Sequence, residues 1–282
     1  MTRRALLAGG IAGAAAVAAL RLLRAAPPGG AAAWERTNHA GRTVTLLEGP
    51  AYVSGAAAGA LAVATGPAGA VAPVLATVSA GGFGALDDLA GDSRSKGLKG
   101  HLGALARGEV TTGAVKILGL GLTGLVSAAL VDRSTRRSAG ADTSGRRPAT
   151  LDTLVGGAVI AGAANLLNLL DLRPGRALKV TVLAGTLLAT DARSEAAAGA
   201  AVGAAAALLG PDLAGESMLG DTGANSAGAL LGTALVQRSG RGARLGALAV
   251  LAGLTLASER VSFTKVIEST PGLRELDALG RR

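Results

Sequence analysis

Long apolar stretches alternate with short polar islands along the chain, and this alternation most restricts the possible folds. The apolar stretches lie near 5–20, 50–66, 68–86, 113–131, 151–170, 176–190, 195–210, 221–236 and 245–257. A helix needs about 20 residues to cross the hydrocarbon core of a bilayer, and several stretches approach that length. The pattern predicts an all-α, polytopic integral membrane bundle of about nine transmembrane helices. We expect one domain over 1–258 and a short cytoplasmic tail over 259–282.

The composition separates a membrane bundle from a soluble core. Hydrophobic residues make up 49% of the chain and the mean hydropathy is +0.44, yet aromatic residues make up only 1%. A soluble domain of this length normally buries many Phe, Tyr and Trp side chains. Gly and Ala instead let helices approach closely in lipid. The same scarcity leaves almost no aromatic belt at the membrane interfaces, which is atypical of membrane proteins.

The net charge of +9 and the absence of cysteine exclude several classes of function. The basic residues are scattered between apolar stretches without interleaved aromatic residues, so we expect no nucleic-acid partner. Anionic lipid headgroups and phosphorylated substrates suit these charges better. Without cysteine there is no disulfide, no thiolate metal site and no cysteine nucleophile.

The polar island at 87–101 has the residue types of a catalytic loop at a membrane surface. Asp87 and Asp88 supply hard carboxylate oxygens, which Mg²⁺ prefers. Lys96 and Lys99 supply ammonium groups that neutralise phosphate oxygens, and the glycines between them let the backbone approach a ligand. The alternative is an ordinary solvated loop between two membrane helices.

Two further islands stand at the ends of apolar stretches. Asn165, Asn168 and Asp171 are spaced at i, i+3 and i+6, so on a helix they fall roughly along one stripe. Polar groups inside a membrane segment are costly and therefore point to a function. The third island contains Gly-Asp-Thr-Gly at 220–223, with Asp221 as its acidic residue.

In this order, the three islands resemble the polyprenyl-phosphate N-acetylhexosamine-1-phosphate transferases. These integral membrane enzymes include phospho-N-acetylmuramoyl-pentapeptide transferase, and the resemblance covers roughly 38–221. It implies transfer of a sugar-1-phosphate from a UDP-sugar to polyprenyl phosphate, with release of UMP, in cell-envelope polysaccharide or peptidoglycan precursor synthesis. It further implies Mg²⁺ as cofactor, a multi-pass protein of the cell membrane, an active site on the cytoplasmic side and a homodimer as one expected assembly.

The resemblance also implies roles for the acidic and basic residues of the islands. Asp221 matches the family's metal ligand. Asp87 or Asp88 would orient or deprotonate the lipid phosphate, and Lys96 and Lys99 would neutralise the diphosphate.

Three more residues are expected in the binding pocket. Asn168 and Asp171 match residues that bind near the nucleotide and the metal. Arg42, in what corresponds to the family's first cytoplasmic loop, is the expected phosphate contact. Lys116, at the start of another apolar stretch, is expected to be a plain interfacial anchor.

The chain departs from the family pattern in several places. Where the family continues with Gly and a further Asp, this chain has the basic, turn-forming run 172–179, whose Arg and Lys side chains would offset pyrophosphate charge. Ala224 replaces the usual Ser, so the hydroxyl contact is either missing or taken over by Asn225 or Ser226. The family's His-rich loop is absent. These departures favour an alternative, a catalytically degenerate member acting as a membrane scaffold or partner. A transporter or lipid flippase is a third hypothesis.

Two observations on topology leave alternatives open. The segment 132–150 contains five arginines, which the positive-inside rule places in the cytoplasm. Counting spans from the 87–101 island puts this segment on the other side, and all three islands must share one side to form a site. Arg3 and Arg4 before a short apolar run also fit a cleaved signal, as an alternative to a first transmembrane helix.

Overall fold

A computed structural model of the chain describes residues 1–38, 41–64, 66–90, 103, 107–109, 111–138 and 149–281. Apart from one small hairpin, its regular structure is helical. The helices are α1 (Arg3–Ala25), α2 (Ala31–Trp34), α3 (Glu48–Ala62), α4 (Gly66–Ala90), α6 (Thr112–Ser138), α7 (Ala149–Leu170), α8 (Arg176–Leu188), α9 (Glu195–Leu213), α10 (Gly220–Arg238), α11 (Arg241–Ser258), α12 (Phe263–Ser269) and α13 (Leu273–Ala278). The antiparallel hairpin pairs β1 (Glu35–Thr37) with β2 (Thr43–Thr45).

Five of the described helices are long and apolar enough to cross a membrane, namely α1, α4, α6, α7 and α9. A sixth is reached if α11 and α12, which meet at a bend of 95°, count as one broken span. The architecture agrees with an all-α, multi-pass membrane bundle, whereas the expected number of nine spans is not confirmed. Helices α3 and α8 have 15 and 13 residues, fewer than a straight crossing needs.

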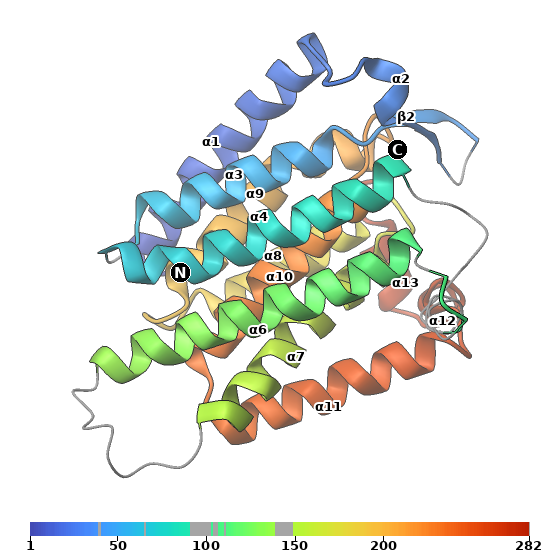
Figure 1. The fold of residues 1–282 in the computed structure, drawn as a ribbon. Helices are drawn as coiled ribbons and strands as arrows, with labels where there is room; N and C mark the ends of the chain where they lie inside the picture. Colours follow the sequence, from blue (N-terminus) through green and yellow to red (C-terminus); the bar gives the residue numbers. More distant parts are fainter. Residues whose placement is uncertain are drawn as a thin grey trace.

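Helix α10 runs through the middle of the bundle, with α4 and α7 packed along it (Figure 1). Nearly all of its side chains are buried, including polar ones. Glycines allow the close approaches. A Cβ on Gly228 would lie 2.2 Å from the carbonyl oxygen of Ala163 in α7, and one on Gly203 of α9 would lie 2.0 Å from that of Gly9 in α1. Small residues thus provide the helix contacts that the composition predicts.

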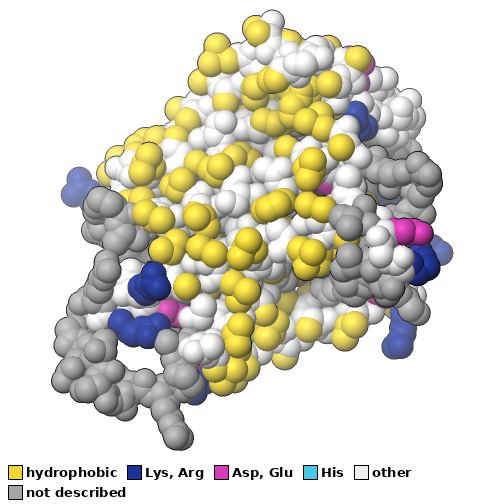
Figure 2. Space-filling model, in the orientation of Figure 1, with side chains coloured by type: hydrophobic (Ala, Val, Ile, Leu, Met, Phe, Trp, Pro, Cys, Tyr) yellow, Lys and Arg dark blue, Asp and Glu magenta, His cyan; other side chains and the backbone are white. Residues whose placement is uncertain are grey.

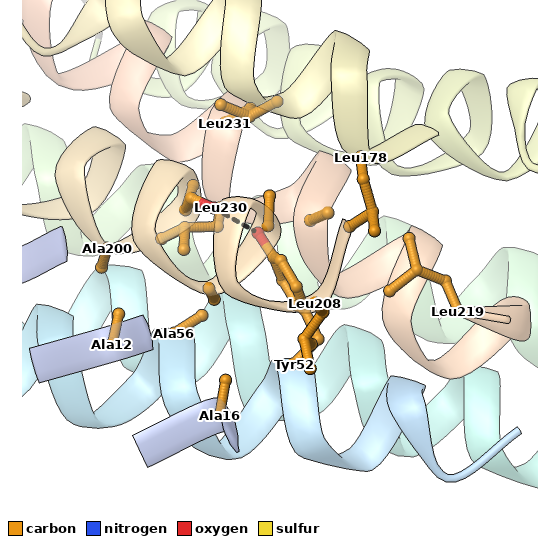
Figure 3. Close-up of a cluster of buried hydrophobic side chains, with 14 of the residues drawn as sticks. Ala12, Ala16, Tyr52, Ala56, Leu178, Ala200, Leu208, Leu219, Leu230 and Leu231 are labelled. Atoms are coloured by element: carbon orange, nitrogen blue, oxygen red, sulfur yellow. Dashed lines mark hydrogen bonds between the residues drawn. The ribbon is translucent and has the colours of Figure 1, made fainter. Parts of the chain in front are cut away.

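The core between α1, α3, α8, α9 and α10 is built mainly from Ala and Leu, with one aromatic side chain at its centre. Figure 3 shows Tyr52 surrounded by leucines that include Leu208 and Leu219. Its hydroxyl donates a hydrogen bond of 3.4 Å to the carbonyl oxygen of Ala201, so the polar end of this fully buried ring has a partner (Figure 3).

The outer surface of the bundle is apolar over its middle. Figure 2 shows hydrophobic side chains spread across one face, with Lys and Arg side chains mainly near its two edges. Large residues such as Leu6, Leu118 and Leu256 are more than half exposed. Such a surface suits contact with lipid and is unfavourable in water.

The two ends of the bundle differ in what they carry. At one end, the site end, α4, α7 and α9 finish, α6, α8 and α10 begin, and the hairpin, α12 and α13 gather (Figure 1). The described residues of the three polar islands therefore reach the same end, as a common site requires. Helix α6 continues through Ser138, so the first part of 132–150 is helical. Its Arg133 and Arg136 lie at the opposite end, where the conflict with the positive-inside rule persists.

Candidate functional site

A cavity of about 700 Å³ opens at the site end. Most of the predicted site residues line it although they come from distant parts of the chain. These are Arg42, Asp87, Asp88, Asn168, Asp171 and Asp221. Arg173, expected to offset pyrophosphate charge, also lines it, as do two charged residues that were not predicted, Arg36 and Asp212. Lys96 and Lys99 lie outside the described residues.

An ion-paired group joins three helices beside this cavity. The Nζ of Lys116, in α6, lies 2.6 Å from Oδ2 of Asp87, in α4, and also contacts Oδ2 of Asp221, in α10. The three side chains are between 16% and 24% exposed, so they are neither sealed in the core nor free in solvent. The expectation that Lys116 is a plain interfacial anchor is wrong, because two carboxylates from other helices converge on its ammonium group.

The neighbouring Asp88 has a different set of contacts. Its Oδ1 accepts a hydrogen bond from the backbone N–H of Asp221 at 3.0 Å, and its Oδ2 accepts from the N–H and hydroxyl of Thr222 at 2.9 and 2.6 Å. These are N–H groups of the first turn of α10, which have no partner within their own helix. Asp88 therefore holds the start of α10 in place. Both aspartates lie in the last turns of α4, which ends at Ala90, and not in the expected loop.

The hairpin brings two guanidinium groups to the cavity. Its turn is closed by the backbone N–H of Arg42, which donates to the side-chain oxygen of Asn38 at 3.0 Å. Arg36 donates to the backbone carbonyl of Asp88 at the end of α4. The N–H of Met218 donates to the carbonyl of Thr45 at 3.0 Å, which ties the hairpin to the segment before α10. The strands were not predicted, because each is only three residues long.

The second island is divided by the structure. Asn168 and Asp171 line the cavity. Asn165 instead donates a hydrogen bond of 3.2 Å to the hydroxyl of Thr255 in α11 and contributes to helix packing. Burial raises the pKa of Asp171 well above its usual range, and the negative charges of Asp212 and Asp221 raise it further. The carboxylates of this wall therefore repel one another, which favours a cationic partner.

Two other expectations are corrected. Of the basic run after Asp171, only Arg173 lines the cavity, because Arg176 and Lys179 bond to the C-terminal segment. Asn225 and Ser226 are fully buried in α10 and do not line the cavity, so they do not take over a contact there.

The donor set suits a divalent cation in one respect. Asp87 and Asp221 direct carboxylate oxygens to the same cationic centre, the ammonium of Lys116. Mg²⁺ is commonly bound by one or two carboxylates, with waters and substrate phosphates completing its ligands, so two aspartates are enough protein ligands. Within the part of the chain that the structure describes, no group of three or more His, Cys, Asp or Glu residues is arranged to hold a metal ion.

Comparison with known proteins yields no match to a protein-family model and none to a curated protein. The chemistry of the site therefore rests on its own geometry. Sequence reasoning missed Lys116, Arg36 and Asp212 as site residues. Like the predicted residues, each is a charged residue near the end of an apolar stretch or in the loop before one. This position was the signal that could have identified them as site residues.

Proposed function

We propose that this protein is a membrane phosphoglycosyl transferase that moves a sugar-1-phosphate from a UDP-sugar to polyprenyl phosphate. The observation that carries the proposal is the convergence of Asp87, Lys116 and Asp221 from three helices beside one cavity. That cavity carries guanidinium groups on its rim and lies at one end of an apolar bundle. Such a site suits a substrate with a lipid tail and a phosphorylated head, because each part meets matching chemistry.

In the reaction, an oxygen of the lipid phosphate forms a bond to the β-phosphorus of the UDP-sugar. The bond from that phosphorus to the bridging oxygen breaks, and the oxygen leaves with UMP. Negative charge on the phosphate oxygens must be offset throughout. Arg36, Arg42 and Arg173 are placed at the cavity to do this.

The two adjacent aspartates take different roles in this proposal. The oxygens of Asp88 are engaged by N–H and hydroxyl groups at the start of α10. Asp87 accepts a hydrogen bond from the ammonium of Lys116 and lines the cavity, so it is the residue we assign to orient or deprotonate the lipid phosphate. Asn168 and Asp171 form the nucleotide-side wall.

Mg²⁺, when bound, would stabilise charge on the phosphate oxygens. Asp221 and Asp87 are the residues that would hold it. Lys116 would keep the two carboxylates together and neutralise one charge while the site is open.

A second function is favoured by one specific observation. Lys116 occupies the point on which Asp87 and Asp221 converge, so an ammonium group already neutralises the carboxylates. In a catalytically degenerate member this ion pair would be a permanent link between α4, α6 and α10, and the protein would act as a membrane scaffold or partner in envelope assembly.

Transfer of radiolabel from a panel of UDP-sugars to polyprenyl phosphate, in membranes with and without Mg²⁺, separates these functions. For the transferase, we expect labelled lipid from the wild type that falls roughly a hundredfold or more in Asp221→Asn and disappears without the metal. Asp152→Asn is the matched control, because Asp152 pairs with Arg241 at the opposite end. Equal background labelling by wild type, Asp221→Asn and Asp152→Asn on every donor would refute the transferase and favour the scaffold.

A further inference from the structure

The C-terminal segment Phe263–Arg281 turns across the site end and packs on the segment that leads into α8. The chain bends by 95° between α11 and α12, so it crosses the end of the bundle and does not continue along α11. Figure 1 shows α12 and α13 at this end. None of the predicted roles uses this segment.

A buried ion pair anchors the segment. Nε of Arg176 lies 2.7 Å from Oδ1 of Asp277 and Nη2 lies 2.9 Å from Oδ2, a bidentate pairing. Arg176 also donates to the hydroxyl of Thr264 at 3.0 Å. Arg176 is 3% exposed and Asp277 is 8% exposed. Pairings of this kind are the strongest hydrogen bonds between side chains, and they fix orientation as well as distance.

Two more cationic side chains, Lys179 and Arg281, bond to the C-terminal segment, and one of them connects it to the wall of the cavity. We call these contacts, with the Arg176–Asp277 pair, the C-terminal clamp. Lys179 donates to the backbone carbonyls of Leu276 and Asp277 at 3.1 and 2.7 Å, at the end of α13. Arg281 pairs with Asp277 at 2.7 Å and donates to the carbonyl of Pro174 at 2.9 Å. Pro174 lines the cavity. The side chain of Arg281 therefore ties the C-terminal segment to the backbone of the cavity wall.

The same segment also contacts a charged group of the cavity. Glu268, in α12, lies 3.1 Å from the guanidinium of Arg173, which lines the cavity and is largely shielded from solvent. An arginine that is already restrained loses less conformational freedom when it binds an anion.

We propose that Asp277 is a positioning residue for the substrate site. Through Arg176 and Arg281, Asp277 holds residues 172–175 in place. This keeps Arg173 in the cavity wall, where its guanidinium can contact a diphosphate group. This inference rests on the proposed function for the identity of the ligand, and on the contacts above for the positioning itself.

Hydrogen exchange read by mass spectrometry tests the positioning without any activity. In Asp277→Asn, we expect amides of 171–176 and 263–281 to exchange roughly tenfold faster than in the wild type, since local opening governs their protection. Amides of α1 and α3 should not change, which shows that the protein remains folded. Glu259→Gln, an exposed change of the same kind before α12, should match the wild type. Asp277→Glu keeps the carboxylate and should recover most of the protection.

Steady-state kinetics with the donor found in the transfer assay tests the functional part. Because the wall binds substrate and does not react, Asp277→Asn should raise KM for the UDP-sugar about tenfold and leave kcat within about twofold. Unchanged exchange at 171–176 overturns the inference whatever the transfer assay shows. Faster exchange with an unchanged KM also overturns it. Faster exchange in a protein whose wild type transfers nothing supports the clamp and refutes the proposed function instead.

Discussion

Two ion-paired groups, one at each end of the bundle, use similar residues in different ways. At the opposite end, Arg244 pairs with Asp132 at 2.9 Å and donates to the carbonyls of Asp152, Ser239 and Val236. The second oxygen of Asp132 accepts from Thr153 at 2.8 Å. Both charges are over nine-tenths buried, and each has partners on several sides. This group links α6, α7, α10 and α11.

At the site end, polar groups are left with capacity for more partners. Asp87 and Asp221, which both pair with Lys116, line a cavity. Two buried carboxyl oxygens have no hydrogen-bond partner among the described residues: Oδ2 of Asp212, which lines the cavity, and Oε1 of Glu48, whose other oxygen accepts from the cavity-lining Ser217. Native proteins leave few buried polar atoms unpaired, and such atoms gather where a ligand, ion or proton is handled. The comparison teaches that charges with partners on every side hold helices together, whereas charges beside the cavity keep the capacity to bind a further group.

The largest effect should come from breaking the satisfied group. Arg244→Met leaves Asp132 buried without its charge partner and should lower the free energy of unfolding by about 3–5 kcal/mol. Thermal unfolding in detergent, followed by circular dichroism, measures this. Arg241→Met, which removes an exposed ion pair with Asp152, is the control and should change the free energy of unfolding far less than Arg244→Met does. Equal losses in both variants would contradict the assignment of a structural role to Arg244.

Breaking the other group should affect activity more than stability. Lys116→Met should reduce transfer to polyprenyl phosphate roughly a hundredfold or more, because it removes a preorganised charge beside the reacting phosphates. Asp87 and Asp221 line the cavity and are partly exposed, so water can solvate them and the melting temperature should change little. A variant that transfers normally but unfolds much more easily would show that Lys116 is structural, as Arg244 is.

A smaller effect should separate the two adjacent aspartates. Asp88→Asn weakens the bonds to the start of α10 and should lower stability by about 1–2 kcal/mol, the range for loss of a helix cap. Asp87→Asn should leave stability nearly unchanged and reduce transfer. Stability and transfer activity are measured in both variants. If the roles differ, Asp88→Asn loses more stability and Asp87→Asn loses more activity. The same ranking of the two variants in both assays would show that they do not.

The smallest effect is a dependence of stability on pH that has opposite signs at the two ends. The pKa of Asp171 is raised in the folded protein, which therefore binds this proton more tightly than the unfolded chain does. Its contribution to stability falls as pH rises above about 4, the ordinary pKa range of an aspartate. Asp171→Asn should therefore stabilise at neutral pH and have no effect below about pH 4. The pKa of Asp191 is lowered by Arg193. Its contribution is present above that range and lost on acidification, so Asp191→Asn should destabilise slightly at neutral pH only.

Melting temperatures of both variants across this pH range provide the test. The Asp191 effect should stay below about 1 kcal/mol, because its pair with Arg193 is exposed and screened. Parallel pH profiles for the two variants would contradict the opposite signs.

The polar islands were recognisable in the sequence because carboxylates and amides are rare inside apolar segments. Asp87, Asp171 and Asp221 stand out for that reason, and all three line the cavity. Lys116 did not, since a single lysine near the start of an apolar stretch has a sufficient explanation as an anchor. Its importance depends on α4 and α10 lying beside α6, and no local pattern encodes that arrangement.

The different contacts of Asp87 and Asp88 could not be predicted from the sequence either. Successive residues on a helix point about 100° apart, so neighbours that look equivalent in a chain can face different helices. Here one faces Lys116 and the other faces the first turn of α10. The same holds for Asn165, which the stripe pattern grouped with Asn168 but which bonds to α11.

By itself, the sequence determined the all-α membrane architecture and the chemical types gathered at one end of it. Composition and segment length control both, through the cost of exposing apolar surface to water and polar groups to lipid. Only the tertiary structure decided which charges are partners, since pairing depends on which helices touch and on the direction of each side chain. It also decided that the C-terminal segment folds onto the cavity wall, because the partners of Arg176 and Pro174 lie about a hundred residues further along the chain.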